Sequence, residues 1–562
     1  MFDEITKSKV QEFRRYYDKQ YQERYRDRHF EGKTDGGIPI KPFYTPMDLD
    51  SLDYDDIGFP GQYPFTRGIY PIMYQSQPWV MQQIHGHGTP EHCRERMDYL
   101  ASLGLTGYGE IRSYNIVFDQ VCKFGYDPDH PEAGDMVGLV GVNMSTLGDY
   151  DRLLHGLDLK KTSVVLNQGI HSMVALAFYL TYAEKKGVSK EDIRGNTMNW
   201  LYKGWMTDLE MYPPDSAFMI MSNFVRWCSR NIPKWNTTNI VSYFAEEAGG
   251  TPVQEAAMAM AIGVAITEEC INNGCQPDEF LPRFGFQIAL GSDIFEHVAK
   301  IRAMRRMWST INKERFGAKD IHSLQLRCHS QTSAVSLTAQ QPLVNIIRSA
   351  YQAFGGILAG VNGMTINPYD EALGIPTDES LMLAMRTHQV ALYETGVPNV
   401  TDPLAGSYYV EWLTDKIYQE AIKYFQKIED LGGFKECWKS GWLRRELEES
   451  AYKWRQRLDT QEKVMVGLNK FQSTKHRKTE IYKVDPKVKD TCVKRIREYR
   501  ANRGKENERK QALEHLRVAC EGVLDNQKMD FMPALIECAR AYSTVQEMCD
   551  VMKSVFGWGT VY

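Results

Sequence analysis

The chain contains 562 residues, of which 43% are hydrophobic and 25% charged, and its formal net charge is -5. This length and composition are typical of a globular protein of two or three domains. The net charge gives no reason to expect nucleic-acid binding, no apolar run is long enough to span a membrane, and the N-terminus does not resemble a signal peptide. We therefore expect a cytoplasmic protein. The eleven cysteines have no metal-binding spacing, which indicates reduced structural thiols and no metal site.

The first forty residues are rich in Arg, Tyr and Gln and have little apolar periodicity. Basic residues mixed with aromatic ones occur in RNA-binding segments. Acidic residues of comparable number lie among them, which favours a different interpretation. We predict that residues 1–40 form an arm that docks on another subunit.

Between about residues 70 and 400, short apolar runs alternate with segments of helical periodicity. The runs predict strands at 163–168, 239–244, 284–290, 323–328 and 356–361. The segments between them, such as 255–271 and 295–311, predict amphipathic helices. A β-then-α order sustained over this length predicts a parallel sheet, either open or closed into a barrel.

Two observations favour the barrel. Polar residues such as Asn167, His329 and Asn367 follow predicted strands, as expected where strand ends build an active site at one end of a barrel. The loops G-x-G-x-x-G and G-x-x-x-x-G-K-[ST], which bind phosphates in open nucleotide-binding sheets, do not occur in the sequence. We place the substrate-binding barrel at residues 41–405.

After about residue 405 the pattern changes to long, charged helices, and we expect a helical segment packed on the barrel at 406–471. The stretch 472–512 is strongly basic, which is consistent with an acidic partner or, more commonly, with a solvated linker and helix. The last fifty residues regain amphipathic periodicity. Residues 472–562 are therefore expected to form a basic linker and a C-terminal helical end-piece.

Seven motifs occur in order along the chain, namely YPFTRGIYPIMYQSQPW (63–79), FGYDPDHPEAGDMVGLVGV (124–142), MYPPD (211–215), PKWNTTNIVSYFAEEAGG (233–250), LRCHSQTSAVSLTAQ (326–340), INPYDEALGIPT (366–377) and DPLAGSYYVE (402–411). Over about residues 35–562 this set resembles the methylmalonyl-CoA mutase family. The size of the chain and its C-terminal tail are most similar to the large subunits of isobutyryl-CoA and 2-hydroxyisobutyryl-CoA mutases.

The resemblance implies an α/β fold with an eight-stranded parallel (β/α)8 barrel, an N-terminal arm and a C-terminal helical extension. In this family the substrate lies along the barrel axis, and adenosylcobalamin is held between the barrel and a flavodoxin-like domain. The His of a D-x-H-x-x-G motif in that domain ligates the cobalt. Because this sequence lacks the motif, we expect a separate small cobalamin-binding subunit with the flavodoxin-like fold and an α2β2 heterotetramer.

The chemistry that the resemblance implies is a radical 1,2-rearrangement, which makes the chain the substrate-binding subunit of an isomerase. Homolysis of the cobalt–carbon bond gives a 5′-deoxyadenosyl radical that removes hydrogen from the substrate, a neighbouring group migrates, and the hydrogen returns. The protein's tasks are to position the reactants and to exclude water and radical quenchers.

Five residues match functional positions of the family. Gln331, Asn367 and Glu371 match contacts of the adenosyl ribose, and the simpler interpretation is that they are surface-loop residues. Tyr243 and His329 match positions that line the substrate channel. A packed core tyrosine and a satisfied structural histidine are the alternatives for these two.

The positions expected to contact the acyl group differ from those of the family. Ile84 stands where methylmalonyl-CoA mutases have Tyr and isobutyryl-CoA mutases have Phe. Ile is the residue of 2-hydroxyisobutyryl-CoA mutases, where it makes room for a tertiary carbon, but the acidic residue that contacts the substrate hydroxyl in those enzymes is Val117 here. Phe244 replaces the His that hydrogen-bonds the thioester carbonyl. Asn167, at a predicted strand end, is a further substrate-binding candidate.

The charged contacts of the family also change. The Arg that binds the methylmalonyl carboxylate falls on Asp208, or on Thr207 if the alignment gap moves. Four basic positions near the CoA entrance carry other residues, namely Gln75, Gln77, Gln82 and His322. Each change from Arg to Gln removes a charge and a bidentate phosphate contact, for which a base such as Arg112 is a possible replacement.

The first hypothesis is therefore an adenosylcobalamin-dependent mutase of a branched or bulky acyl-CoA that is similar to isobutyryl-CoA or 2-hydroxyisobutyryl-CoA. Methylmalonyl-CoA is not expected, because its carboxylate would face Asp208. The second hypothesis is the same chemistry on a substrate that is not a CoA ester and carries an amine for Asp208. The third, a catalytically silent scaffold, is disfavoured by the matching adenosyl-side residues.

Overall fold

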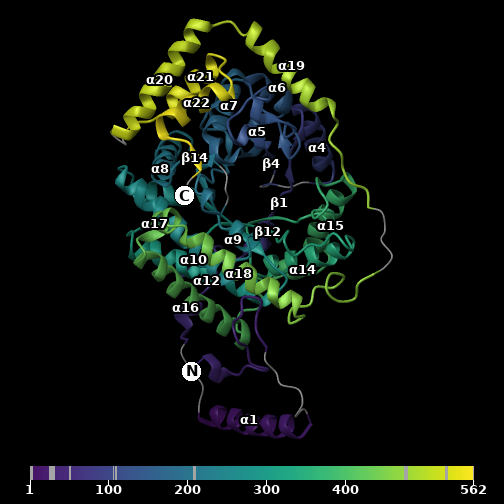
Figure 1. Cartoon of the computed structure of the whole chain (residues 1–562). Helices are drawn as coiled ribbons and strands as arrows, with labels where there is room; N and C mark the ends of the chain where they lie inside the picture. Colours follow the sequence, from purple (N-terminus) through teal and green to yellow (C-terminus); the bar gives the residue numbers. More distant parts are fainter. Residues whose placement is uncertain are drawn as a thin grey trace.

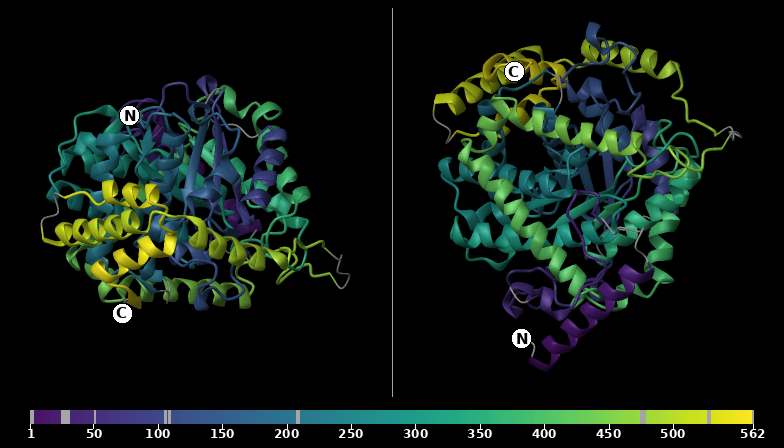
Figure 2. Two further views of the ribbon diagram at one scale, coloured as in Figure 1. Left: turned by 90° about the horizontal axis from the view of Figure 1, so that it is seen from above. Right: turned by 60° about the horizontal axis from the view of Figure 1, so that its bottom comes forward.

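The computed structural model describes residues 4–24, 32–49, 52–104, 107, 110–206, 210–473, 479–525 and 529–560. The protein is a mixed α/β structure in which parallel strands lie at the centre and helices surround them (Figure 1 and Figure 2). Helix α1 (Glu4–Arg24) stands apart from this body, next to the N-terminus in Figure 1. Within the described ranges, no helix has the length and apolar character needed to cross a membrane.

Two five-stranded sheets form the centre of the molecule. The first has the order β1 (Val80–Met81), β13 (Gly363–Thr365), β12 (Cys328–Thr332), β11 (Phe284–Leu290) and β10 (Thr238–Val241). The second has the order β2 (Ile84–His85), β4 (Arg112–Val117), β6 (Thr162–Asn167), β7 (Arg194–Thr197) and β9 (Trp235–Asn236). All neighbouring strands in these two sheets are parallel, so their carboxyl ends share one edge.

Two short segments of the chain belong to both sheets. Strands β1 and β2 are separated by two residues, so segment 80–85 pairs with β13 through one part and with β4 through the other. Strands β9 and β10 are separated by Thr237, so segment 235–241 pairs with β7 and with β11. The two sheets are therefore continuous with each other through these segments.

The helices that follow the strands begin where the sequence supplies capping residues. Helix α10 (Pro252–Asn272) starts with a capping box, because the Thr251 hydroxyl accepts from the Gln254 amide at 3.2 Å and the Gln254 side chain accepts from the Thr251 amide at 2.8 Å. Pro252 follows at the first helical position, where it forfeits no helical hydrogen bond. This helix and α12 (Ile294–Glu314) confirm the helices predicted at 255–271 and 295–311.

Two predicted strands were misplaced. Residues 321–324 form helix α13 and β12 begins at Cys328, whereas the prediction was a strand at 323–328. Residues 356–358 end helix α14 (Val344–Leu358), and the strand follows at β13. The run 356–361 is apolar because this helix end is buried against β11, where a Cβ at Gly356 would lie 2.6 Å from Leu290 Cδ1. A short apolar run does not distinguish a buried helix end from a strand.

The strongly basic C-terminal stretch docks on acidic residues of the same chain. Helix α19 (Lys487–Asn502) carries Arg500, whose guanidinium pairs with Asp127 at 2.7 Å and with Asp129 at 2.8 Å. Asp127 is fully buried, and burial raises the pKa of its carboxyl group to about 6 although Arg500 opposes this shift. The acidic partners of this basic helix are thus residues of the same chain, including those in the loop that follows α5 (Gln120–Lys123).

The helices after α19 return the chain to the helices that surround the parallel sheets. Helices α20 (Glu506–Asp525), α21 (Met532–Arg540) and α22 (Val545–Phe556) pack against one another, and α21 and α22 contact α7 (Ser172–Lys185). Strand β14 (Gly559–Thr560) then pairs antiparallel with β8 (Glu210–Met211).

One buried arginine joins three separate parts of the structure. Arg302 on α12 is 1% exposed, and its guanidinium pairs with Glu411 on α16 (Tyr408–Asp430) at 2.6 Å. It also pairs with Asp402, which in turn accepts from Arg67 at 3.2 Å. Removing one partner of a buried ion pair leaves the other charge without compensation.

We predict that Arg302→Met lowers the free energy of unfolding by about 3 to 5 kcal/mol, because Glu411 and Asp402 then lose a buried counter-charge. Urea unfolding followed by circular dichroism measures the change. The matched control is Arg455→Met, which removes an exposed ion pair with Asp459 and should leave the midpoint nearly unchanged. Equal midpoints for the two variants would contradict the role given to Arg302.

Candidate functional site

A cavity of about 490 Å³ is lined by residues from strands of both sheets, and we call it the bore. Its lining includes Gln82, Ser113 and Ser163 on one side and Phe286 and His329 on the other. It reaches the amino ends of the strands, since the first residues of β7 and β11 belong to its wall. The bore therefore opens at the edge opposite the carboxyl ends.

Small and polar residues keep the bore open. Gln82 donates to the Ser113 hydroxyl at 2.8 Å, and its side-chain oxygen accepts from Asn115 at 3.4 Å. His329 Nε2 lies 2.9 Å from the Thr365 hydroxyl, and burial lowers the pKa of this histidine to about 4, so it is neutral. A Cβ at Gly363 would approach His329 Nδ1 to 2.7 Å, so glycine is required there to leave the ring in place.

Four cations lie around the amino-end opening, and we call them the mouth cations: Arg194, Lys234, Arg283 and Arg327. Lys234 pairs with Asp192 at 3.3 Å, and Arg327 donates to the backbone oxygen of Phe284. Arg194 and Arg283 have no carboxylate partner in the part of the chain that the structure describes. Burial lowers the pKa of Arg283, and such a cation gains from an anionic ligand.

Only some of the residues predicted at the CoA entrance line the bore. Gln77 and Gln82 line the bore, whereas Gln75 and His322 do not. Arg112, the first residue of β4, is exposed at the same edge between the lining residues Ile111 and Ser113. The sequence analysis missed the mouth cations, although each begins a strand or directly precedes one.

Polar side chains form a continuous chain of hydrogen bonds at the carboxyl ends of β11, β12 and β13. Gln287 donates to Gln331 at 2.8 Å, and Gln331 donates to Asn367 at 2.9 Å. The Asn367 side chain is close enough to Tyr243 to lower the pKa of its hydroxyl, although burial raises that pKa overall. We call these four residues the amide chain. It brings together three of the predicted residues and shows that none of them is a surface-loop residue, because all are buried.

Two carboxyl groups border the amide chain. Burial raises the pKa of Glu371 to about 7, and the nearby charges of Asp370 and Glu247 add to the shift. Burial also raises the pKa of Glu247 to about 7, although the amides of Ala334 (3.1 Å) and Val335 (2.9 Å) donate to it. The Glu371 carboxyl accepts no hydrogen bond from any residue that the structure describes, so it is an acceptor available to a ligand.

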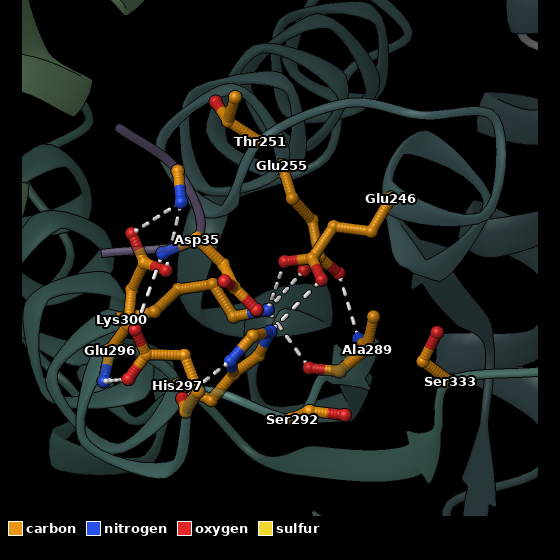
Figure 3. A network of polar contacts seen from close by, with 12 residues as sticks. Asp35, Glu246, Thr251, Glu255, Ala289, Ser292, Glu296, His297, Lys300 and Ser333 are labelled. Atoms are coloured by element: carbon orange, nitrogen blue, oxygen red, sulfur yellow. Dashed lines mark hydrogen bonds and ion pairs between the residues drawn. The ribbon is translucent and has the colours of Figure 1, made fainter. Parts of the chain in front are cut away.

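A buried ionic network around Lys300, shown in Figure 3, holds Glu246 of the short helix α9 (Tyr243–Glu247). The same helix carries Tyr243 and Phe244. Lys300 Nζ lies 2.6 Å from Glu246 and also pairs with Glu255. His297 Nε2 is 3.0 Å from the second oxygen of Glu246. Burial opposes charge on Glu246, but Lys300 and His297 lower the pKa of its carboxyl group. Glu246, Glu255, Lys300 and His297 thus form one buried network, in which burial raises the pKa of Glu255 to about 8.

The network also connects α9 to the end of β11. Glu255 accepts from the Ser242 hydroxyl at 3.0 Å and from the Ala289 amide at 2.9 Å. Lys300 donates to the Ala289 carbonyl at 2.8 Å. Residues that begin α9 and residues near the carboxyl end of β11 are thereby fixed to the same pair of charges (Figure 3).

The remaining predicted residues lie at neighbouring strand ends of the second sheet. Val117 and Asn167 are partners in the register of β4 and β6, and Ile84 is the partner of Asn115. Phe244 packs edge-on against Trp200 with ring centroids 6.0 Å apart. Asp208 and Thr207 lie outside the residues that the structure describes.

A family model described as methylmalonyl-CoA mutase matches residues 33–558. The chain is 36% identical over 529 residues to the 2-hydroxyisobutanoyl-CoA mutase large subunit of Aquincola tertiaricarbonis, which covers 94% of this chain and 92% of that subunit. It is 36% identical over 525 residues to a probable mitochondrial methylmalonyl-CoA mutase of Caenorhabditis elegans (93% and 69%). It is 33% identical over 526 residues to methylmalonyl-CoA mutase of Escherichia coli (93% and 72%).

We predict that Glu371→Gln stabilises the protein at pH 8 relative to the unchanged chain and loses this advantage towards pH 5. The pKa of Glu371 rises from 4.5 to about 7 on folding, so its stabilising contribution is complete below pH 4.5 and is lost as the pH rises through 7. Melting temperatures of both proteins between pH 5 and 8 measure the difference. The exposed Glu394 provides the control, and a difference for Glu371→Gln that does not vary with pH would contradict the prediction.

Proposed function

The chain belongs to the methylmalonyl-CoA mutase family and is a mutase, that is, an isomerase, and on that premise we propose that it is the substrate-binding large subunit of an adenosylcobalamin-dependent enzyme that rearranges a branched acyl-CoA. The family and the name of the Aquincola relative support a carbon-skeleton mutase large subunit. The acyl-CoA substrate, the cofactor and the assembly are the proposal.

The observation that carries the acyl-CoA assignment is the set of mouth cations. Arg194 and Arg283 line the opening of the bore without carboxylate partners in the described part of the chain, and they lie with Lys234 and Arg327. Arginine binds phosphates through bidentate hydrogen bonds, so this opening suits the phosphates of a nucleotide while a thin arm enters the bore. The changes at Gln75, Gln77 and Gln82 therefore do not leave the entrance without cations. No comparable observation favours the amine-bearing substrate.

We infer that the two sheets close into an eight-stranded parallel barrel over residues 41–405. The support is that segments 80–85 and 235–241 each pair with both sheets, which leaves eight distinct strand segments and no free edge between them. Lining residues from both sheets face one bore, as expected when a sheet encloses its axis.

The residues at the carboxyl ends of the strands fit the adenosyl part of adenosylcobalamin. The amide chain offers amide and hydroxyl groups, and the partly buried Glu371 carboxyl accepts no hydrogen bond from the described residues. A ribose, with two adjacent hydroxyl groups, satisfies both requirements. When bound, the cofactor supplies the radical chemistry that starts the rearrangement. Gln331, Asn367 and Glu371 then hold the nucleoside, and Tyr243 closes the site against water.

We propose that the acyl group lies between the amide chain and the strand ends of the second sheet. Ile84 and Val117 present aliphatic side chains there, and Asn167 is the polar neighbour of Val117. This surface favours a branched carbon skeleton over a linear polar one. Rigid positioning is the main contribution of the protein, and the Lys300 network provides it for Tyr243 and Phe244.

We propose that the cobalt ligand comes from a separate small subunit with a flavodoxin-like fold and that two copies of each chain form an α2β2 assembly in the cytoplasm. The supporting observations are the word large subunit in the name of the Aquincola relative and the absence of D-x-H-x-x-G from the sequence given. Helix α1, which stands apart with Phe13 and Tyr16 exposed, is the proposed docking arm.

We predict that desulfo-CoA binds the chain with a dissociation constant in the micromolar range and that Arg283→Gln raises it roughly 10- to 100-fold, because one charge-assisted contact contributes about 1.5 to 3 kcal/mol. Isothermal titration calorimetry measures both constants. Arg540→Gln, which removes an exposed ion pair with Glu184, is the control and should bind like the unchanged chain. Binding no tighter than millimolar would refute the acyl-CoA assignment and favour a substrate that is not a CoA ester.

We also predict that this chain alone binds adenosylcobalamin weakly and has no mutase activity, because no residue of the sequence given lies in a cobalt-ligand motif. Adding the small subunit should restore both properties. Equilibrium dialysis with the purified chain, with and without that subunit, provides the measurement. Micromolar uptake of the cofactor by the chain alone would refute the two-subunit proposal.

A further inference from the structure

Lys300, at the centre of the network in Figure 3, is fully buried and is not among the residues that line the bore. An ammonium group has three protons, and each of them has an acceptor here. The nitrogen lies 2.6 Å from Glu246, within hydrogen-bond distance of Glu255, and 2.8 Å from the backbone oxygen of Ala289. Lys300 therefore has no donor left for a ligand, and its influence on the site passes through its partners.

The first of these partners lies on the helix that carries one end of the amide chain. Glu246 follows Tyr243 by three positions on α9, a helix of only five residues. A helix this short gains little stability from its own hydrogen bonds. Lys300 holds one carboxylate oxygen of Glu246, and His297 Nε2 lies 3.0 Å from the other. The position of Tyr243 therefore depends on these two contacts.

His297 holds Glu246 as a cation, because both of its ring nitrogens face acceptors. Nε2 faces the Glu246 carboxylate, and Nδ1 lies 2.9 Å from the backbone oxygen of Asp293. A carbonyl oxygen and an ionised carboxylate only accept, so each ring nitrogen carries a proton. Burial opposes this charge, but the charge of Glu246 outweighs it and raises the pKa of His297.

The second partner of Lys300 connects it to the other end of the amide chain. The Ser242 hydroxyl lies 3.0 Å from the Glu255 carboxyl group and 3.2 Å from the backbone oxygen of Gln287. Glu255 also accepts from the Ala289 amide at 2.9 Å, two positions further along β11. The backbone at Gln287, where the amide chain begins, is thus tied to Lys300 through Glu255.

A segment near the N-terminus braces the first turn of α12, on which His297 lies. Glu296, its neighbour in the sequence, is fully buried. Its carboxyl group accepts from the Thr34 hydroxyl at 2.5 Å and from the Gly36 amide at 3.0 Å. The first turn of α12 is therefore bound to the N-terminal segment as well as to α9, which makes it a firm support for the side chains that hold α9.

We propose that Lys300 and His297 are positioning residues that hold Tyr243 and Gln287 at the spacing that a nucleoside bound to the amide chain requires. Both act through other side chains, and neither lines the bore. The identity of the nucleoside as the adenosyl group rests on the proposed function.

The affinity of the full chain for 5′-deoxyadenosine, measured by isothermal titration calorimetry, tests the proposal. Lys300→Met leaves Glu246 and Glu255 close together in a region that water does not screen, and it removes the common support of α9 and β11. We expect this variant to bind 5′-deoxyadenosine at least 10-fold more weakly than the unchanged chain. An affinity within 3-fold of the unchanged chain would overturn the proposal.

Arg302→Met is the matched control. Arg302 lies two positions after Lys300 on the same helix and is similarly buried, but the carboxylates with which it pairs are not part of the Lys300 network. Both variants are compared at a temperature at which circular dichroism shows them folded. The control should bind 5′-deoxyadenosine within 3-fold of the unchanged chain. Equal losses in the two variants would indicate a general effect of lost stability, and the proposal would fail.

Two variants of His297 separate its hydrogen bond from its volume and leave Lys300 in place to keep the network folded. His297→Leu cannot donate to Glu246, whereas His297→Gln retains a side-chain amide that donates. The Leu variant should bind 5′-deoxyadenosine at least 5-fold more weakly, and the Gln variant should return to within 3-fold of the unchanged chain. The same loss in both variants would refute a role that depends on the contact with Glu246.

Hydrogen exchange without any ligand distinguishes a failure of this inference from a failure of the proposed function. Mass spectrometry measures the exchange of the backbone amides at 243–250, which include α9. Lys300→Met should speed this exchange at least 10-fold, and Arg302→Met should not. If the unchanged chain does not bind 5′-deoxyadenosine, the assignment of the adenosyl site fails and the exchange alone decides whether Lys300 holds α9. Exchange that Lys300→Met leaves unchanged refutes the positioning role.

Discussion

Hydrogen bonds between polar side chains that face inward keep a cavity open at the centre of this protein. The other functional groups are arranged around this cavity. Gln82, Ser113 and Asn115 satisfy one another across neighbouring strands where a packed core would carry aliphatic residues. His329 turns onto Thr365 because residue 363 has no side chain. A polar wall of this kind is stable only when nearly every group has a partner, and the side-chain oxygen of Asn115, which has none among the described residues, marks a place for a ligand.

The same polar wall explains which strands could be predicted from the sequence. β6, β10 and β11 carry enough apolar residues to appear as strands, and they lie within or close to the predicted runs. β7 reads Arg-Gly-Asn-Thr, and β4 alternates serine and asparagine with its apolar residues, so neither resembles a buried strand by composition. Hydrophobic periodicity identifies strands whose side chains are buried in an apolar core. A strand with one face towards a polar cavity has polar residues on that face, so its sequence lacks the pattern.

The residues of the candidate site could likewise be predicted only in part. The residues of the amide chain could be located because whole motifs, and not single side chains, matched a family, and they do lie together. Arg194, Arg283 and Glu247 were missed because what sets them apart is the lack of an ion pair with any residue that the structure describes. A missing partner is a property of the folded chain and has no counterpart in the sequence. Asp208, to which the sequence analysis assigned a contact with the substrate, lies outside the residues that the structure describes.

The antiparallel pairing of β14 with β8 affects the order in which the protein can fold during its synthesis. Strand β8 is synthesised almost 350 residues before its partner at 559–560. During translation β8 therefore has no strand partner until residues 559–560 have been made. A chain cut short before residue 559 can form the surrounding helices and still lack this strand pair. The edge of β8 would then stay unpaired, and an unpaired strand edge is a site of aberrant pairing with other chains.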